Sequence, residues 1–551
     1  MNAHRDAGGN AAEPLAEVAV VVIGYDDAAH VTEAVRSALA QGRAVREVVA
    51  VDDCSTDGSA GLLERLASSE PRLRVIRRRV NSGGCGTPRN TGLDAVTSPY
   101  VMFLDSDDVL PPGAADALLE AATGAHAEVV SGLCVRRELP SGREVPWQPR
   151  LYALHSTVPH PARRPRLVHD TLCVNKLYRT AFLREHGIRF PEGRFPYEDV
   201  VFTARVLAAA PRVALIPDRV YVWHVRRSAE RLSISLDRAG IVNWRARTEA
   251  CRQAYEILLG AGQKELARAA RAKFLDHDLR MYLRELGLRD ASYQRAWWDL
   301  TRAHLAGYDA DDWARNPAAP GRLAGRVVLA GPEPRDLPRL RELAARPARL
   351  RPPYARAADG TPVWSADLPQ VSLGPLLTRP VGALPLAVDA ALRPRARGTR
   401  LRLRLHELYG RVAEAGPRSV EVEWLHRDDA DLLVRSGRVD LVPCSEASGP
   451  DRDGAWTAEA AVDLAALAAS GAGTWDLRLR IRFQGGATRD VTAHALTGAG
   501  LLRRRAVPSA RHGVVLVQPY ATHSGALALR VAPGARGALS VVRGRLRRLL
   551  D

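Results

Sequence analysis

Aromatic side chains are scarce in this sequence, and cysteine is rare and scattered. Phe, Trp and Tyr make up 5% of the 551 residues. A nucleic-acid-binding surface usually alternates Lys and Arg with exposed rings, so the composition argues against nucleic acid as a partner. No CxxC pair occurs, and single cysteines are typical of reduced thiols in a cytosolic protein rather than of a zinc site. The six cysteines are Cys54, Cys85, Cys134, Cys173, Cys251 and Cys444.

Long apolar runs are also missing. No stretch stays apolar for long enough to cross a bilayer, and residues 1–16 lack the apolar centre of a signal peptide. We therefore expect a cytoplasmic protein. Neither GxxxxGK[ST] nor GxSxG occurs, which argues against a P-loop NTPase and against an α/β-hydrolase.

Positive charge, in contrast, is abundant. The formal net charge is +17, and nearly all of the cations are arginine. A positive field attracts nucleic acid, an anionic membrane or a polyanionic substrate, so the sign alone does not choose among these partners. An Ala/Arg-rich coding bias would give the same pattern.

The first third of the chain alternates strands with helices. Continuous apolar runs rich in β-branched residues predict strands at 18–23, 48–51, 73–76 and 101–104, with amphipathic segments such as 31–41 between them. This alternation indicates an α/β domain with a doubly wound, mostly parallel sheet. The length suggests three or four units in all.

Later segments change character. Helical periodicity dominates 237–345, and from about residue 362 short alternating runs indicate an all-β region. We predict a disordered leader at 1–16, a catalytic domain at 17–236, a helical connector at 237–345, a β-sandwich-like domain at 346–505, and a short β segment with a basic tail at 506–551. The tail fits both an amphipathic helix on an anionic membrane and a solvated end, and the sequence leaves both open.

Polar residues follow each predicted strand. Ligands of such sheets bind beyond the carboxyl ends of the strands, so we expect these groups to face one cleft. They are Gly24 and Tyr25 after the first strand, Asp52 and Asp53 after the second, 81–90 after the third and 105–108 after the fourth.

Two acidic groups stand out for their chemistry. Asp105 and Asp107, separated by one serine, supply hard oxygen ligands that suit Mg²⁺ or Mn²⁺ on a diphosphate. The same group also fits a helix N-cap ahead of two prolines. Glu198 and Asp199 open a predicted helix, and they fit either a general base or a cap.

Six sequence blocks in order resemble the family 2 glycosyltransferases with a GT-A fold. They cover about 18–235 and read VVVIGYDDAAHVTEAVRSALAQ, VVAVDDCSTDGS, NSGGCGTPRNTGL, YVMFLDSDDVL, NKLYR and PYEDVVFTARVL. The resemblance implies metal-dependent transfer of a sugar, with inversion, from a nucleotide-sugar donor such as a UDP-sugar to a hydroxyl group.

The resemblance also implies a role for each matching residue. Tyr25 and Asp53 are expected at the uracil, Asp52 and Asp105 near the ribose, Gly84 and Arg89 near the diphosphate, Asp107 on the metal, Asp199 as the base, and Glu198 as an acceptor or structural contact. Asp108 is expected to cap a helix. Downstream, Arg227, Arg231 and Ser233 are candidates for diphosphate or acceptor contacts.

The layout further resembles the bacterial wall teichoic acid glycosyltransferases, which join a family 2 domain through a linker to immunoglobulin-like modules used for trimerisation. This implies a polyanionic or lipid-linked glycan acceptor such as teichoic acid or another surface polysaccharide. It also implies a homotrimer formed through the C-terminal β region. The basic charge would attract an acidic membrane as well as such a polymer, so association with the inner face of the plasma membrane is a further expectation. A non-catalytic glycan-binding protein built on the same domain is the alternative.

Overall fold

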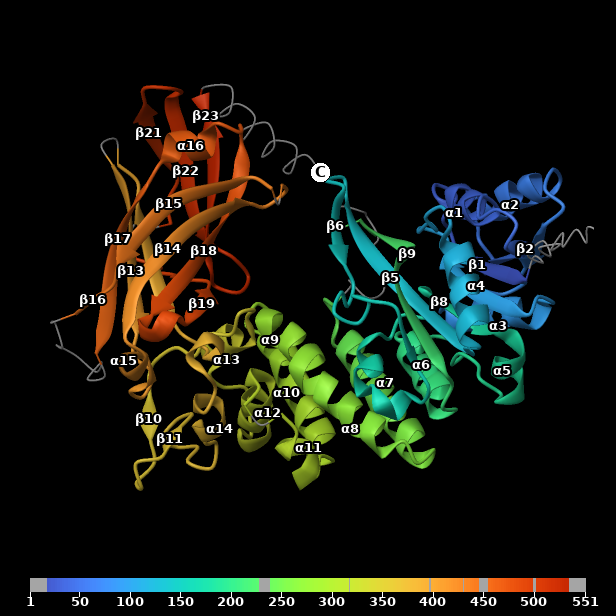
Figure 1. Ribbon diagram of the computed structural model, residues 1–551, viewed down its shortest axis with the longest axis horizontal. Helices are drawn as coiled ribbons and strands as arrows, with labels where there is room; N and C mark the ends of the chain where they lie inside the picture. Colours follow the sequence, from blue (N-terminus) through green and yellow to red (C-terminus); the bar gives the residue numbers. More distant parts are fainter. Residues whose placement is uncertain are drawn as a thin grey trace, which may run out of the picture. The chain divides into compact units, whose positions relative to one another are not determined.

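The computed structural model divides the chain into two compact units, Met1–Lys273 and Phe274–Asp551 (Figure 1). The structure describes residues 17–226, 238–316, 318–395, 398–429, 431–444, 454–498 and 502–534. The predicted leader and basic tail lie outside these ranges.

A nine-stranded sheet forms the centre of the first unit. Its strand order is β3-β2-β1-β4-β8-β5-β9-β7, and β6 pairs with β5. The neighbours among β1 to β4 are parallel, β8 is antiparallel to both of its neighbours, and β5 is parallel to β9. The mostly parallel sheet predicted from the sequence is thus confirmed. The strands are β1 (Val18–Gly24), β2 (Val45–Asp52), β3 (Leu73–Arg77), β4 (Tyr100–Asp105), β5 (Val129–Leu139), β6 (Arg143–Pro146), β7 (Ser156–Val158), β8 (Lys176–Arg179) and β9 (Val213–Arg226).

Helices follow the strands of this sheet. β1 is almost fully buried, as expected of a parallel strand in an α/β fold, whose helices cover both faces of the sheet. Val31, Ala34, Val35 and Ala38 recur at helical spacing and form the buried stripe of α1. The helices are α1 (Val31–Leu39), α2 (Ser59–Ala67), α3 (Gly86–Ala95), α4 (Ala114–Ala125), the short η1 (Pro161–Arg163) and η2 (Pro165–His169), α5 (Thr180–Glu185), α6 (Glu198–Ala208), α7 (Ile241–Gly260) and α8 (Lys264–Lys273).

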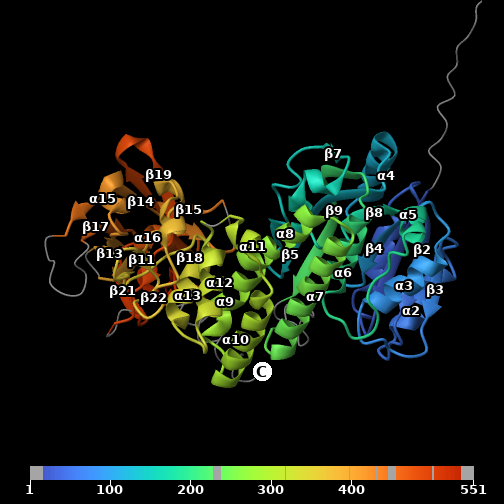
Figure 2. The same cartoon turned by 90° about the horizontal axis from the view of Figure 1, so that it is seen from below.

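The predicted connector is helical, and its helices divide between the two units. α7 lies beside α6, and α8 packs on η2 in the first unit (Figure 2). The remaining helices belong to the second unit. They are the π-helical turn η3 (Phe274–Leu279), α9 (Arg280–Leu286), α10 (Ala291–Ala306), α11 (Ala310–Ala314), α12 (Pro320–Ala330) and α13 (Leu337–Ala344).

The rest of the second unit is built mainly of strands. One sheet has the order β16-β17-β13-β12-β20, the other has the order β15-β14-β18-β23-β22-β21 with β19 beside β18, and β10 pairs with β11. The strands are β10 (Ala355–Arg356), β11 (Pro362–Val363), β12 (Val388–Arg393), β13 (Thr399–His406), β14 (Pro417–His426), β15 (Leu433–Asp440), β16 (Val442–Pro443), β17 (Ala455–Val462), β18 (Gly473–Phe483), β19 (Thr488–Val491), β20 (His494–Ala495), β21 (Arg505–Ser509), β22 (Gly513–Ala521) and β23 (Leu527–Pro533). Short helices join them at α14 (Gly374–Leu377), η4 (Val381–Ala383), α15 (Arg411–Ala415), α16 (Leu464–Ala468) and η5 (Gln484–Gly486).

Alternation along the strands explains these two larger sheets. In β13, Leu401, Leu403 and Leu405 are buried, and the arginines between them lie on the opposite side. Strands β21 to β23 continue the sheet of β14 and β18, because β23 pairs with β18. The predicted all-β C-terminal region is confirmed. Within the described ranges, no helix is both long and apolar enough to span a membrane.

Candidate active site

Three parallel strands end side by side at one edge of the first sheet. Gly24 pairs with Asp52, and Ile23 pairs with Asp105, so the last residues of β1, β2 and β4 are level with one another. The Asp53 amide donates to the carbonyl of Gly24 at 2.9 Å. The structure therefore brings the loops of the predicted cleft together at this edge.

The loop after β1 presents an aromatic ring and a carboxylate. Tyr25 is 38% exposed. Asp27 accepts a hydrogen bond from the Ser106 hydroxyl at 2.7 Å, and its other oxygen lies 2.5 Å from His30 Nδ1. Asp27 thus joins the β1 loop to the loop after β4. The sequence analysis did not single out this residue, although it stands within the first matching block.

Asp52 and Asp53 are buried at the end of β2. Asp52 accepts from the Ser55 amide at 3.0 Å through Oδ2, whereas its Oδ1 is buried without a hydrogen-bond partner among the described residues. Asp53 Oδ1 pairs with Arg78 Nε at 2.8 Å, and Oδ2 accepts from the Ser82 hydroxyl at 2.7 Å. Asp53 therefore holds the loop after β3 against the end of β2.

Gly84 leaves room for the loop that precedes α6. A β-carbon at this position would lie 2.4 Å from the carbonyl oxygen of Gly193, which is too close for any side chain. Asn90 fixes the same loop, because it donates to the Phe190 carbonyl at 3.0 Å and accepts from the Phe190 amide at 2.9 Å. The glycine loop and α3 thus form the support on which the start of α6 rests.

Arg89 joins the two acidic groups predicted from the sequence. Its guanidinium donates to Asp105 at 2.6 Å and to Glu198 at 2.5 Å, and the residue is only 3% exposed. It also lies over the Phe190 ring, 5.3 Å from the centroid. The described contacts of Arg89 are thus with carboxylates of the site, which the sequence analysis did not foresee.

Glu198 and Asp199 occupy the first turn of α6, where the helix dipole favours negative charge. Burial raises the pKa of Glu198 to about 7; Arg89 opposes this shift and the charge of Asp199 adds to it. Burial also raises the pKa of Asp199, against the attraction of Arg247 and Arg89. The residue before them, Tyr197, has a left-handed backbone with φ of 71°. A carboxyl group with a raised pKa binds a proton more readily, as general base chemistry requires.

Asp107 provides the exposed carboxylate of the DSDD loop, with 42% of its side chain accessible. Burial and the negative charges of Asp105 and Asp27 raise its pKa to about 6, against the attraction of Arg226. Arg226 Nη1 lies 3.4 Å from the carboxylate and donates to the Asp107 carbonyl at 3.0 Å. A carboxylate beside two others is a position that a divalent cation would stabilise. Among the described residues, no group of three His, Cys, Asp or Glu side chains is placed to hold a metal ion.

Asp108 does not cap a helix, which corrects the sequence-based expectation. The next helix, α4, begins at Ala114, and its N-cap is Gly113. Asp108 instead accepts from the Tyr221 hydroxyl and from the His224 amide, both at 2.7 Å. Pro111 and Pro112 separate Asp108 from the start of α4. The buried carboxyl group of Asp108 therefore hydrogen-bonds to residues of β9 instead.

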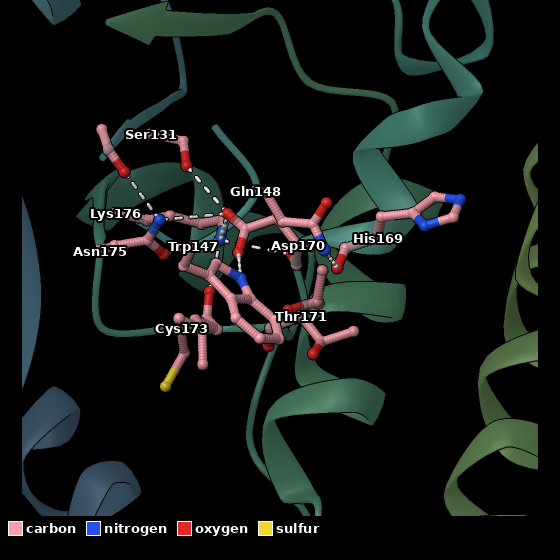
Figure 3. A network of polar contacts seen from close by, with 12 residues as sticks. Ser131, Trp147, Gln148, His169, Asp170, Thr171, Cys173, Asn175 and Lys176 are labelled. Carbon is pink, nitrogen blue, oxygen red and sulfur yellow. Dashed lines mark hydrogen bonds and ion pairs between the residues drawn. The ribbon is translucent and has the colours of Figure 1, made fainter. Parts of the chain in front are cut away.

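A second polar network lies around Asp170 (Figure 3). Lys176 Nζ lies 2.7 Å from its Oδ2, Asn175 donates to the same oxygen at 3.2 Å, and Trp147 Nε1 donates to Oδ1 at 2.8 Å. Burial raises the pKa of Asp170, but the charge and hydrogen bond of Lys176 outweigh it, so the pKa lies below its ordinary value. The NKLYR block thus anchors the segment between β6 and β8.

Three predicted residues cannot be placed. Arg227, Arg231 and Ser233 lie outside the described residues. The sequence analysis did not predict the contacts made by Asp27, Arg78 and Arg226. No short pattern in the sequence indicates these contacts.

Comparison with known proteins places this geometry in context. Poly(ribitol-phosphate) beta-N-acetylglucosaminyltransferase TarS of Staphylococcus aureus is 31% identical over 221 residues, which are 40% of this chain and 37% of that protein. Succinoglycan biosynthesis protein ExoO of Rhizobium meliloti is 30% identical over 239 residues, which are 41% of this chain and 66% of that protein. The matched stretch thus covers little more than a third of the first relative.

The whole fold has a counterpart among solved structures. The crystal structure of S. aureus TarS superposes with a TM-score of 0.51 at 19% identity, covering 94% of this chain and 85% of that one. This likeness concerns the fold. Residues 19–187 match the family described as glycosyl transferase family 2. This match covers the part of the chain that carries Asp52, Asp53 and Asp105 at the edge of the parallel strands, and this part is therefore similar to glycosyl transferase family 2.

Proposed function

We propose that the protein is an inverting glycosyltransferase that moves a sugar from a UDP-sugar to a hydroxyl group of an anionic cell-surface polymer. The family 2 match over 19–187 and the arrangement of carboxylates at the sheet edge support the reaction type. The relative TarS, named for poly(ribitol-phosphate) and N-acetylglucosamine, supports a ribitol phosphate polymer as acceptor and UDP-N-acetylglucosamine as the first donor to test.

The donor nucleotide is assigned to the loops after β1, β2 and β3. Tyr25, which is exposed, is placed against the uracil ring. Asp53 can accept a hydrogen bond from the imide N–H of the uracil only if it gives up its contact with Arg78 or with Ser82. Asp52 keeps a buried oxygen without a partner among the described residues, and a ribose hydroxyl would satisfy it. Asp105 is assigned to the other side of the ribose.

The diphosphate is assigned to the DSDD loop. Asp107 fits a divalent cation because its carboxylate is accessible and has two carboxylates nearby. Mg²⁺ in such sites is typically held by one or two carboxylates together with substrate phosphates, so a cage of three protein ligands is not needed. When bound, the ion neutralises charge on the departing diphosphate. Arg227, Arg231 and Ser233 remain candidates for the diphosphate or the acceptor, and Gly84 for the approach of the glycine loop to the phosphates.

The base is assigned to Asp199. It takes the proton from the acceptor hydroxyl while the oxygen of that hydroxyl bonds to the anomeric carbon. The bond from this carbon to the diphosphate breaks on the opposite face, and the configuration inverts. Glu198 is held by Arg89 and is assigned a positioning role. Arg89 is likewise assigned a positioning role, because it connects Glu198, the neighbour of the base, to Asp105.

One observation carries the proposal: a single buried arginine, Arg89, joins Asp105 at the end of β4 to Glu198, which opens α6 beside Asp199. This contact holds the donor loop and the base in one fixed arrangement, as inversion requires. The layout of the chain supports action at the inner face of the plasma membrane and assembly into a trimer as further parts of the proposal.

The test is transfer of sugar to poly(ribitol phosphate) from UDP-N-acetylglucosamine, with UDP-glucose and UDP-galactose in parallel. The reactions are run with Mn²⁺, with Mg²⁺ and with a chelator, and the linkage of the product is read by NMR. Asp199→Asn is expected to lose transfer, whereas Asp94→Asn, which changes an exposed carboxylate of the same unit, is expected to keep it. Equal activity of Asp199→Asn and wild type would refute the assignment of the base. UDP binding without transfer to any acceptor would favour the non-catalytic alternative.

A further inference from the structure

The outer face of β12 and β13 carries a row of exposed arginines. We call the side chains of Arg393, Arg400 and Arg402 the arginine face. β13 lies between β12 and β17, and Figure 1 shows β13 and β17 running together. Arg400 and Arg402 are 53% and 55% exposed. The leucines that alternate with them point into the core, so the strand keeps the guanidinium groups on the outside.

Like charges oppose each other on this face. Arg393 of β12 pairs directly with Arg400 of β13. Side chains directly opposite on neighbouring strands are close, so two cations in these positions destabilise the pairing. Nothing in the packing of the sheet requires arginine here, because the residues lie on the solvent side. The arrangement works against folding and therefore points to a role outside folding.

Carboxylates do not balance the arginine face among the described residues. Glu459 of β17 is the acidic partner, 2.9 Å from Arg402 and 3.8 Å from Arg400. The small residues Ala391 and Ala461 lie opposite these arginines on the neighbouring strands. Glu459 thus lies within ion-pair distance of two of the three guanidinium groups, and the third, that of Arg393, has no ion pair among the described residues.

The second large sheet of the same unit shows the opposite arrangement. We call its outer side, on β14, β15, β18 and β19, the matched face. Four of its arginines lie 3.3 Å or less from carboxylates, as Arg435 with Glu423, Arg438 and Arg482 with Glu421, and Arg480 with Asp490, whereas Arg478 on the same side has no ion pair among the described residues. A coding bias toward arginine would affect both faces alike. The two faces differ in the number of carboxylates beside the arginines, which is one on the arginine face (Glu459) and three on the matched face (Glu421, Glu423 and Asp490).

We propose that the arginine face binds the phosphodiester groups of the acceptor polymer, at a site separate from the one where the sugar is transferred. The identity of the polymer rests on the proposed function. Guanidinium groups match phosphate oxygens with paired hydrogen bonds. Arg400 and Arg402 are two residues apart on one strand, about 7 Å, so each reaches a different phosphate. A long polymer held here by several phosphates stays with the enzyme between transfers.

Binding by the full chain tests the proposal directly. Arg400→Gln with Arg402→Gln is compared with Arg435→Gln and Arg480→Gln, which removes the same charge from the matched face. The probe is fluorescent poly(ribitol phosphate), titrated at several salt concentrations. The first variant is expected to bind about tenfold more weakly, and its plot of log K against log salt to be shallower by roughly 1.4, from two lost phosphate contacts. The second variant is expected to stay close to wild type. An equal loss in both variants would show a general charge effect and overturn the proposal.

Kinetics separate this surface from the active site. With long polymer the arginine-face variant is expected to show a raised KM and an unchanged kcat, and with a one-unit acceptor both constants are expected to match wild type. Unchanged KM for long polymer would reject the proposal. So would a change of oligomeric state in sedimentation, which would assign the face to a second copy of the chain, or a loss confined to anionic vesicles, which would assign it to a membrane. If wild type glycosylates no polymer, the proposed function fails, and the binding titration still decides the role of the arginine face.

Discussion

Both units of the chain bury carboxyl groups, and they treat them in opposite ways. At the sheet edge of the first unit, burial raises the pKa values of Glu198 and Asp199, even with Arg89 close by. In the second unit the side chain of Glu342 is 2% exposed, against 12% for Glu198, yet its pKa is lowered. Burial again acts to raise it, but hydrogen bonding from His494 and the charge of Arg349 outweigh that effect.

The difference lies in the number of basic side chains that contact each carboxylate. In the first unit one arginine serves both Asp105 and Glu198. In the second, Glu342 has Arg349 at 2.5 Å and His494 at 2.9 Å, and Asp389 has His406 at 2.8 Å and Arg351 at 3.1 Å. Well-paired carboxylates stabilise a fold, whereas under-paired ones are available to move protons. This contrast separates a site from a structural cluster.

Removing Arg89 is expected to have the largest effect. Arg89→Met leaves Asp105 and the more buried Glu198 without their cation, and breaking a buried pair such as Arg89 with Glu198 costs about 3–5 kcal/mol. Sugar transfer should be lost as well. Hydrogen exchange under urea, read on peptides of the first unit, measures the stability. Arg189→Met, which removes an exposed arginine of the same unit, is the control and should cost less than about 1 kcal/mol. A similar small cost for Arg89→Met would mean that the buried pairs are unimportant.

Asp199→Asn is expected to act on the rate alone. Loss of a general base slows transfer by about 10²–10⁴-fold, while neutralising an under-paired carboxyl should leave the first unit as stable as before or more stable. Glu342→Gln should do the reverse, because Arg349 then loses its partner in the second unit. Rates of UDP release and urea unfolding of both variants test the contrast. A destabilised Asp199→Asn protein with full activity would contradict both expectations, the loss of rate and the unchanged or higher stability.

The pH dependence of the two units should have opposite signs. Because the pKa of Glu198 is raised to about 7, its contribution to stability is full below the unfolded value of about 4.3 and is lost as the pH rises through about 7. Transfer needs the ionised base Asp199, whose pKa is also raised, so the rate should rise with pH, at most roughly tenfold per pH unit. Glu342 and Asp389 have lowered pKa values, so their contribution is present above about 4.3 and is lost on further acidification.

Profiles of kcat/KM and of urea midpoints against pH measure these two slopes. Glu198→Gln removes the carboxylate next to Asp199 and should shift the activity profile toward lower pH. A profile that is flat between pH 5 and 8 in wild type would contradict the role given to the pair.

Much of this arrangement can be predicted from short patterns in the sequence. The buried run of β1 predicts a parallel strand, and the rule for the carboxyl ends of such strands predicts that Asp52 and Asp105 lie at one edge, as they do. The alternation in β13 likewise predicts a strand with leucine on the inside. Patterns with a short period predict the structure because they depend only on the geometry of the helix or strand itself.

Short patterns in the sequence do not predict which side chains pair with one another. Arg89 was expected at the diphosphate, and its carboxylate partner Glu198 is 109 residues away, so only tertiary packing brings them together. Asp108 was expected to cap a helix, but the turn at the two prolines places α4 later in the chain. The arginine face was not recognised either. Whether an arginine of one strand meets an acid or another arginine depends on the register between strands, which spacing within a strand does not fix.

The smallest expected effect concerns an exposed pair of the matched face. Arg480 lies 2.7 Å from Asp490, with side chains 49% and 70% exposed. A double-mutant cycle with Arg480→Gln and Asp490→Asn should give a coupling of about 0.2–1 kcal/mol, because water screens such pairs, and the coupling should shrink as salt is added. The same cycle on Arg349 and Glu342 should give a larger coupling that salt barely changes, because both residues are buried. If the two cycles agreed, burial would not be what distinguishes structural charge pairs from surface ones in this chain. The matched face would then hold its charges for stability, and it would no longer serve as a neutral control for the arginine face.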